Sequence, residues 1–337
     1  MKSFSKGRLT ASVGLVALAG LLGACASAEQ AEPEALEQEA VETETAESTE
    51  PESTEPEIQS LSIGIKPIPG YAPIQVAVSE GLFQAEGLDV SLEVMGPGTT
   101  VPAVVGGTVQ FSGNTWLAVV QAEAQGIDLV NVAELERGVP GYAEFVVASG
   151  SSVQSLADLD GAVIGVPESP GNCDLAALAV EQEENLGASF EFIALPVPDM
   201  PGAVARGDVD AACVPEPILG GMKASGDFRP VFDVFAGNYD DFPVSGVFTT
   251  AEFAAENPNT VAAVQRALAA AKDLAQADEQ VIRDAILEYT PAPPAAVAGM
   301  TLPSYPDDDF TTISAAIALL EATGQIDPGL VIEGVND

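Results

Sequence analysis

From residue 61 onward, short hydrophobic segments with the alternation of β-strands are separated by segments with helical periodicity. Residues 61–66 alternate apolar and polar side chains, 73–80 have a helical pattern, and 162–166 form an apolar run typical of a buried strand. Further strands are predicted at 88–95, 109–112, 129–133, 142–148, 191–194 and 210–214, and further helices at 101–105, 114–125, 153–159, 172–183 and 201–206. This βα order predicts the α/β class, with mostly parallel sheets covered by helices on both faces.

The strand–helix order runs through two cycles, which predicts two doubly wound lobes with a ligand cleft between them. The predicted first lobe is 59–147 plus 248–337, and the predicted second lobe is 148–247. The chain is expected to cross between the lobes near 146–149 and 245–248, as two hinge strands that permit closure. The C-terminal helices, which are expected to pack on the first lobe, are predicted at 251–256, 260–276, 279–289 and 313–323.

The first 25 residues have the pattern of a secretory signal. Lys2, Lys6 and Arg8 form a basic start, and the apolar stretch at 11–22 is too short to favour a membrane-spanning helix. The stretch ends in Leu22-Gly-Ala-Cys25, which resembles a bacterial lipobox. The resemblance implies that residues 1–24 are cleaved and that Cys25 carries lipid; an ordinary signal peptide with an incidental cysteine is the alternative.

Residues 25–58 are predicted to be an acidic, disordered tether between the lipid and the folded domain. Between 26 and 57 the chain has twelve Glu, no Lys, Arg or aromatic residue, and the sequence Ser-Thr-Glu-Pro-Glu at both 48–52 and 53–57. Few apolar side chains and a high like charge leave this segment without enough burial to offset the entropy of ordering. The remaining residues, from 59 to 337, are sufficient for two lobes.

The whole chain has 11 basic residues, 51 acidic residues and no histidine. Histidine-dependent nucleophiles and histidine metal sites are therefore excluded. The negative charge repels nucleic acid and anionic headgroups, so we expect no nucleic-acid partner and membrane contact through the lipid anchor only. A saline habitat would explain the acidity; calcium binding is the alternative, although Asp307-Asp-Asp309 lacks the glycine and distal Glu of a calcium loop. No metal and no cofactor is predicted.

A series of segments resembles the solute-binding proteins of ABC importers for nitrate, sulfonates, taurine and thiamine-precursor pyrimidines. The segments are Tyr71-Ala-Pro-Ile-Gln-Val-Ala77, Glu80-Gly-Leu-Phe83, Glu86-Gly-Leu-Asp-Val90, Val104-Val-Gly-Gly-Thr-Val-Gln-Phe-Ser112, Gly126-Ile-Asp-Leu-Val130, Ser155-Leu-Ala-Asp-Leu-Asp-Gly161, Val163-Ile-Gly-Val-Pro167, Ala203-Val-Ala-Arg-Gly-Asp-Val-Asp-Ala211 and Pro215-Glu-Pro217. Their order is more specific than any one segment. It implies the type II periplasmic-binding-protein fold, which closes on a small solute and presents it to a membrane permease.

Ligands of such sheets bind beyond the carboxyl ends of strands, where loops and helix N-termini converge. The candidate ligand-binding residues in these loops are Tyr71, Asn114, Thr115, Trp116, Glu168, Asn172 and Glu216. The aromatic members could stack on a solute, with core packing as the alternative. The amide and hydroxyl members stand at helix starts, where an N-cap role is the alternative.

The two candidate carboxylates, Glu168 and Glu216, favour an amine, amidine or aminopyrimidine and disfavour an anion. Lys66 and Arg137 are the basic residues near the predicted cleft loops, whereas a nitrate or sulfonate site usually needs several donors. Helix N-termini can hold an anion without a cation, so this class stays open. We expect a neutral or cationic heterocyclic or amino solute.

Cys173 and Cys213 lie at or just beyond the carboxyl ends of two strands that should be neighbours, 162–166 and 210–214. An oxidising compartment permits a disulfide between them. Two buried thiols are the alternative.

Together these features predict an extracytoplasmic, lipid-anchored, monomeric protein that captures a small solute between its lobes and delivers it to an ABC permease with its ATPase. A lipoprotein that senses the solute for a membrane receptor is the alternative, because both functions require capture and closure. An enzyme on the same fold is a second alternative. Related pyrimidine synthases rely on histidine, which this chain lacks, and no other nucleophile–base pair stands out.

Overall fold

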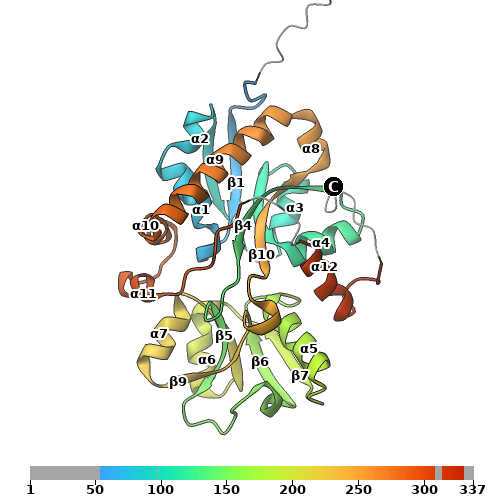
Figure 1. Cartoon of the computed structure of the whole chain (residues 1–337), viewed down its shortest axis with the longest axis vertical. Coiled ribbons are helices and arrows are strands. Elements are labelled where there is room, and N and C mark those ends of the chain that lie inside the picture. Colours follow the sequence, from blue (N-terminus) through green and yellow to red (C-terminus); the bar gives the residue numbers. More distant parts are fainter. Residues whose placement is uncertain (1–53, 97, 308–312, 330–337) are drawn as a thin grey trace, which may run out of the picture. The chain divides into compact units, whose positions relative to one another are not determined.

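The computed structural model describes residues 54–96, 98–307 and 313–329. The predicted signal peptide, Cys25, the predicted tether up to residue 53, and Asp308 and Asp309 lie outside the described residues. The described part contains two five-stranded sheets flanked by helices (Figure 1). We name them sheet A and sheet B, and the parts of the chain built around them the first and second lobes. The predicted α/β class with two lobes is confirmed.

Sheet A has the strand order β2-β1-β3-β10-β4. Its members are β1 (Ser60–Ile65), β2 (Asp89–Val94), β3 (Phe111–Thr115), β4 (Leu129–Arg137) and β10 (Pro243–Thr250). Strand β1 is parallel to both β2 and β3, and β10 is antiparallel to both β3 and β4. The carboxyl ends of β1 and β3 therefore meet at one edge of the sheet, where loops can carry a binding site.

Sheet B has the order β7-β6-β8-β5-β9 and repeats this pattern. Its members are β5 (Ala143–Ala148), β6 (Ala162–Val166), β7 (Phe190–Ala194), β8 (Ala211–Pro215) and β9 (Phe228–Asp233). Strand β6 is parallel to β7 and β8, and β5 is antiparallel to β8 and β9. In each sheet the antiparallel strand in fourth place, β10 or β5, directly follows a passage of the chain from the other lobe.

Helices bury apolar side chains on both faces of sheet A. One core lies beneath α1 (Ala72–Ser79), α2 (Leu82–Ala85), α9 (Pro258–Ala277) and α10 (Glu279–Tyr289), and includes Phe83, Leu268 and Ile286. The opposite face is covered by α3 (Thr100–Val105) and α4 (Trp116–Ala124). Two further helices, α8 (Ala251–Glu256) and α11 (Pro294–Gly299), follow β10 and α10 respectively.

Sheet B is covered by α5 (Asn172–Glu184) on one face and by α6 (Met200–Arg206) and α7 (Ile218–Ser225) on the other. The last described helix, α12 (Ile313–Ala322), contacts both α4 of the first lobe and α5 of the second. The apolar core beneath α4, α5 and α12 is accordingly continuous between the two lobes. Helix α12, one of the C-terminal helices predicted to pack on the first lobe, thus contacts both lobes.

The chain leaves sheet A after Arg137 and enters sheet B at Ala143; it returns between Asp233 and Pro243. The two passages pair with each other through Gly138 N to Phe242 O at 2.9 Å and Asp241 N to Gly138 O at 3.0 Å. The sequence pattern placed the passages later, near 146–149 and 245–248. An apolar strand has the same pattern whichever sheet it joins, so β5 and β10 could not be assigned to a sheet from their side chains.

The segment that leads into β1 is held on the N-terminus of α9. The Glu57 carboxylate accepts hydrogen bonds from Asn259 N at 3.0 Å and from Thr260 N at 2.8 Å, and Ile58 N donates to Thr260 Oγ1 at 3.1 Å. These donors lower the pKa of Glu57 to about 2, against the opposing effect of desolvation. The end of the predicted tether is therefore fixed to the first lobe.

None of the helices in the described ranges has the length and apolar character needed to cross a bilayer.

Candidate functional site

An ion pair joins loops from the two lobes at the carboxyl ends of β1 and β6. Lys66 follows β1, and its Nζ donates to Asn114 Oδ1 of β3 at 3.0 Å and to Glu168 Oε2, just beyond β6, at 3.4 Å. The Lys66 side chain is 15% exposed and that of Glu168 is 32% exposed. Two predicted residues, Asn114 and Glu168, thus share one lysine across the lobe boundary.

The Asn114 amide is held in one orientation by its other contacts. Its Nδ2 donates to Thr100 Oγ1 at 2.7 Å, and its Oδ1 also accepts from Thr115 N at 2.9 Å. This arrangement leaves the carbonyl end of the amide directed at Lys66. Asn114 is therefore a fixed acceptor that positions the ammonium group at the boundary.

Thr115 and Trp116 lie next to this cluster but have structural contacts within the first lobe. Thr115 Oγ1 accepts from Ala118 N at 3.3 Å and caps α4. The Trp116 ring is fully buried against Gly246, where an added Cβ would lie 2.0 Å from the ring. These contacts correspond to the capping and packing alternatives named for these two residues.

Tyr71 is fully buried, with its ring against Gly113, where an added Cβ would lie 1.9 Å from the ring. Its hydroxyl is buried and has no hydrogen-bond partner among the described residues. Burial first, and then the charges of Glu136 and Glu168, raise the pKa of Tyr71 well above its usual value. A buried hydroxyl without a partner is costly, so this atom is suited to bind a solute.

Glu136, which the sequence pattern did not single out, is a buried carboxyl between the two passages of the chain. It is 1% exposed and accepts from Tyr142 Oη and Ser245 Oγ, both at 3.0 Å. Burial raises its pKa to about 7, while the two hydrogen bonds and the charge of Lys66 oppose the rise. Its carboxyl group occupies the space beside Gly70, where an added Cβ would lie 2.0 Å from the carboxyl carbon.

Three other tyrosines surround the loop that carries Tyr71. Tyr289 Oη donates to Ile68 O at 2.6 Å, and Tyr305 Oη donates to Pro69 O at 3.3 Å. Burial and the negative charge of Glu136 raise the pKa of Tyr142, Tyr289 and Tyr305 well above the usual value. Four of the five tyrosines of the chain therefore gather around one carboxyl group. Tyr289 and Tyr305 fix the backbone of the loop after β1.

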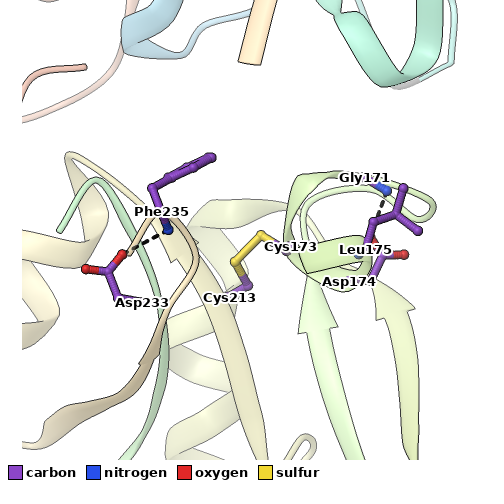
Figure 2. The surroundings of a disulfide bond; sticks show 7 residues. All are labelled: Gly171, Cys173, Asp174, Leu175, Cys213, Asp233 and Phe235. Atoms are coloured by element: carbon purple, nitrogen blue, oxygen red, sulfur yellow. Dashed lines mark hydrogen bonds between the residues drawn. A yellow bond between two sulfur atoms is a disulfide. The ribbon is translucent and has the colours of Figure 1, made fainter. Parts of the chain in front are cut away.

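In the second lobe, Cys173 and Cys213 form a disulfide that joins the start of α5 to the middle of β8 (Figure 2). Next to it, Asp174 Oδ1 accepts from Gly171 N at 2.7 Å and caps α5. Asn172 is the first residue of α5, and its Oδ1 is buried without a hydrogen-bond partner in the described part of the chain. Asn172, like Tyr71, therefore presents an unsatisfied polar atom at a helix start.

Glu216 lies in a different group, at the start of α7. It is 4% exposed, and its two oxygens accept from Gly220 N at 3.0 Å and from Thr301 N at 3.4 Å. Burial raises the pKa of Glu216 against these hydrogen bonds. Since Thr301 belongs to the chain after α11, this carboxylate also bridges the two lobes. Its partners are backbone groups rather than Lys66.

Within the described ranges, no group of three or more His, Cys, Asp or Glu side chains could hold a metal ion.

Glu136 escaped sequence prediction because the strand was expected to end at residue 133, which placed Glu134 and Glu136 in a solvated loop. The available signal was an Ala-Glu-Leu-Glu alternation that continues the strand pattern. Tyr289 and Tyr305 carried no local signal, because they reach the loop before Tyr71 only through the fold.

Comparison with known proteins gives one family and one fold. The family model described as NMT1/THI5 like matches residues 68–280. A protein of Brucella abortus (strain 2308), provisionally named a binding protein, is 28% identical over 214 residues, or 61% of this chain and 63% of that protein. Relatives in Brucella suis and Brucella melitensis match equally. The match thus spans just under two thirds of these relatives' own length.

Two of the solved structures that share the fold are named for what they bind. The alkanesulfonate-binding protein SsuA from Xanthomonas axonopodis pv. citri, bound to MOPS, has a TM-score of 0.67 and 20% identity, and covers 82% of this chain and 98% of its own. The nitrate-binding protein NrtA from Synechocystis PCC 6803 also has a TM-score of 0.67, with 14% identity, and covers 81% of this chain and 84% of its own. These matches establish the type II periplasmic-binding-protein fold.

Proposed function

The chain belongs to the NMT1/THI5-like family, and we propose that it is an extracytoplasmic protein that captures a small solute between its lobes and delivers it to an ABC permease with its ATPase. The Brucella relatives and the neighbours SsuA and NrtA all carry names of binding proteins, and none carries the name of an enzyme. The histidine-free composition fits a binding role as well. No cofactor is needed for capture and release.

One observation carries the proposal: polar groups from both lobes converge at the carboxyl ends of β1 and β3 in the first lobe and of β6 in the second. Lys66 and Asn114 come from the first lobe and Glu168 from the second, and Lys66 is already within hydrogen-bond distance of both Asn114 and Glu168. Tyr71 and Asn172 add buried polar atoms without partners. Such a constellation suits a small polar molecule held by both lobes at once.

Among the predicted site residues we therefore assign solute contact to Tyr71, Asn114, Glu168 and Asn172, and add Lys66. For Thr115, Trp116 and Glu216 we propose a positioning role, since their described contacts cap helices, fill the core or join the lobes.

We further propose that Cys25 carries lipid and holds the protein on the outer side of a membrane. The Leu22-Gly-Ala-Cys25 sequence and the acidic segment after it support this anchoring. The Cys173–Cys213 disulfide fits an oxidising compartment. Cys25→Ser should move the protein from the membrane fraction to the soluble fraction; a wild-type protein that retains residues before 25 in soluble form contradicts the anchor.

The capture function is tested by a thermal-shift screen of the mature protein against sulfonates, nitrate, amines, amino acids, pyrimidines and flavins, followed by calorimetry. A ligand should raise the melting temperature, because it binds the folded state only. Lys66→Met should weaken binding of that ligand at least about tenfold, the effect of losing one charge-assisted hydrogen bond. Arg206→Met is the control, because Arg206 pairs with Asp208 on the exposed surface of the second lobe. Equal affinity in Lys66→Met and Arg206→Met removes the proposed site.

A further inference from the structure

Lys66 and Glu168 present opposite charges to each other across the boundary between the lobes. We infer that this pair selects a zwitterionic solute, whose anionic group binds Lys66 on the first lobe and whose cationic group binds Glu168 on the second. The inference rests on the proposed solute-binding function. The class of solute that it names is more specific than the neutral or cationic class that the carboxylates alone suggested.

The reason lies in what a solute must replace. In the described structure each charge is the counter-ion of the other, and both side chains are largely withdrawn from water. A simple anion that binds Lys66 leaves Glu168 without its counter-ion, and a simple amine leaves Lys66 without its own. A partly buried charge without a partner is costly, so either single-charge solute loses much of what it gains. A zwitterion supplies a partner to both charges.

The surrounding groups give the solute an orientation. Asn114 holds the ammonium of Lys66 from the first-lobe side through an amide fixed by Thr100 and Thr115. The buried hydroxyl of Tyr71 is near enough to Glu168 and Glu136 to be affected by their charges, and it has no hydrogen-bond partner among the described residues. A hydroxyl can donate to an anionic group on Lys66 or accept from an ammonium on Glu168. It therefore suits a solute that carries both.

The other carboxylates of the boundary are engaged elsewhere. Glu136 accepts from Tyr142 and Ser245, and Glu216 accepts from two backbone amides. Glu144 pairs with Lys223 at 2.9 Å. Among these carboxylates, Glu168 is the one whose described ionic partner, Lys66, lies at the strand ends of the opposite lobe. We therefore assign the cationic end of the solute to Glu168.

The test compares three probes of matched length: 3-aminopropanesulfonate, propanesulfonate and propylammonium. Calorimetry on the mature protein should give the zwitterion at least about tenfold tighter binding than either single-charge probe, since each missing charge removes one charge-assisted contact. In the Lys66→Met variant the zwitterion should bind no more tightly than propylammonium does to the same variant. In the Glu168→Gln variant it should bind no more tightly than propanesulfonate does to that variant. Arg206→Met should leave all three affinities unchanged.

The outcomes separate the inference from the proposed function. The zwitterion inference is overturned if propanesulfonate or propylammonium binds as tightly as the zwitterion or more tightly. It is also overturned if only anions, only cations or only neutral compounds bind in the screen. In both cases the proposed solute capture stands. If both variants weaken every probe by the same factor, the pair only joins the lobes and selects nothing. A screen with no ligand in any class contradicts the function itself, and the inference falls with it.

Discussion

The two lobes share one strand pattern but secure the start of their site helix in different ways. In sheet A, Gly64 pairs with Ser112; in sheet B, Gly165 pairs with Ala212. The next residues along β3 and β8 are therefore equivalent, and they are Gly113 and Cys213. In the first lobe the Tyr71 ring packs on Gly113, and in the second lobe Cys173 is bonded to Cys213.

The same joint links the middle of a strand, β3 or β8, to the start of the helix that follows the neighbouring strand, β1 or β6, and it is thus aromatic in one lobe and covalent in the other. The aromatic joint lies among ionisable groups, since Glu136 and three further tyrosines surround it. The two cysteines of the covalent joint do not titrate, because they are bonded to each other in the disulfide. The aromatic joint should therefore respond to pH and the covalent joint to reductants.

The largest effect is expected from removing the covalent joint. Cys173→Ala with Cys213→Ala opens a loop with a sequence separation of 40 residues. Loop-closure entropy then predicts a loss of about 4 kcal/mol in the free energy of unfolding. Urea denaturation of the double variant and of the reduced wild type should agree. A reduced wild type as stable as the oxidised one shows that the bond contributes nothing to this joint.

The next effect concerns pH and belongs to the first lobe. Folding raises the pKa of Glu136 from 4.5 to about 7, so its protonation stabilises the folded state below about pH 4.5 and this contribution is lost as the pH rises toward 7. The change is at most about 3 kcal/mol. Glu136→Gln cannot titrate and should lack this part of the pH dependence, so it should exceed the wild type in stability above pH 7.

Denaturation of wild type and Glu136→Gln across this pH range gives the difference directly. Glu123, whose pKa burial raises to about 8, shifts stability in the same sense, but it is present in both proteins and cancels. Parallel curves for the two proteins would falsify the assignment of the titration to Glu136.

A third prediction adds one methyl group to the aromatic joint. Gly113→Ala places a Cβ 1.9 Å from the ring of fully buried Tyr71, so the ring or strand must shift at a cost of about 2–3 kcal/mol. Gly221→Ala is the matched control: Gly221 lies in α7 with nothing within 4 Å of the added Cβ, and alanine there should stabilise by about 1 kcal/mol. Equal stability of the two variants contradicts the close packing of Tyr71 on Gly113.

The smallest expected change in stability comes from Tyr71→Phe. The substitution keeps the ring on Gly113 and removes a buried hydroxyl without a partner in the described structure, so the free energy of unfolding should stay within about 1 kcal/mol of wild type or rise. Solute affinity should fall if the hydroxyl contacts the solute. Calorimetry and denaturation of this variant therefore separate its two roles, and unchanged affinity leaves Tyr71 with the structural role alone.

Much of the fold could be predicted from sequence because its strands are short, apolar and bounded by helices. Strand β6 and helix α10 have the predicted bounds, β1 and α1 begin and end one residue earlier than predicted, and α5 ends one residue later. Helix α7 and strand β9 were not predicted. Helix α7 contains Gly220 and Gly221, which weaken a helical pattern, and β9 contains Pro230, which weakens a strand pattern.

The site could be predicted only as far as it depends on local order. Asn114 and Glu168 follow from the rule that loops at the carboxyl ends of parallel strands converge. Their shared partner Lys66 was noted as a cation near the site, but its pairing with Glu168 depends on how the lobes meet. The same holds for Glu136, since Tyr142 reaches it from the first passage of the chain and Ser245 from β10. Such contacts leave no periodic trace in a sequence.

The attachment of Glu57 to α9 has a mechanical consequence. If Cys25 is anchored as proposed, any pull on the chain between membrane and protein enters at Glu57 and β1, in the first lobe. Strand β1 is bonded in parallel to β2 over six residue pairs and also to β3, so the force loads these hydrogen bonds in shear, all at once rather than one by one. The passages between the lobes lie outside this path of force. The second lobe can therefore move while the first bears the load.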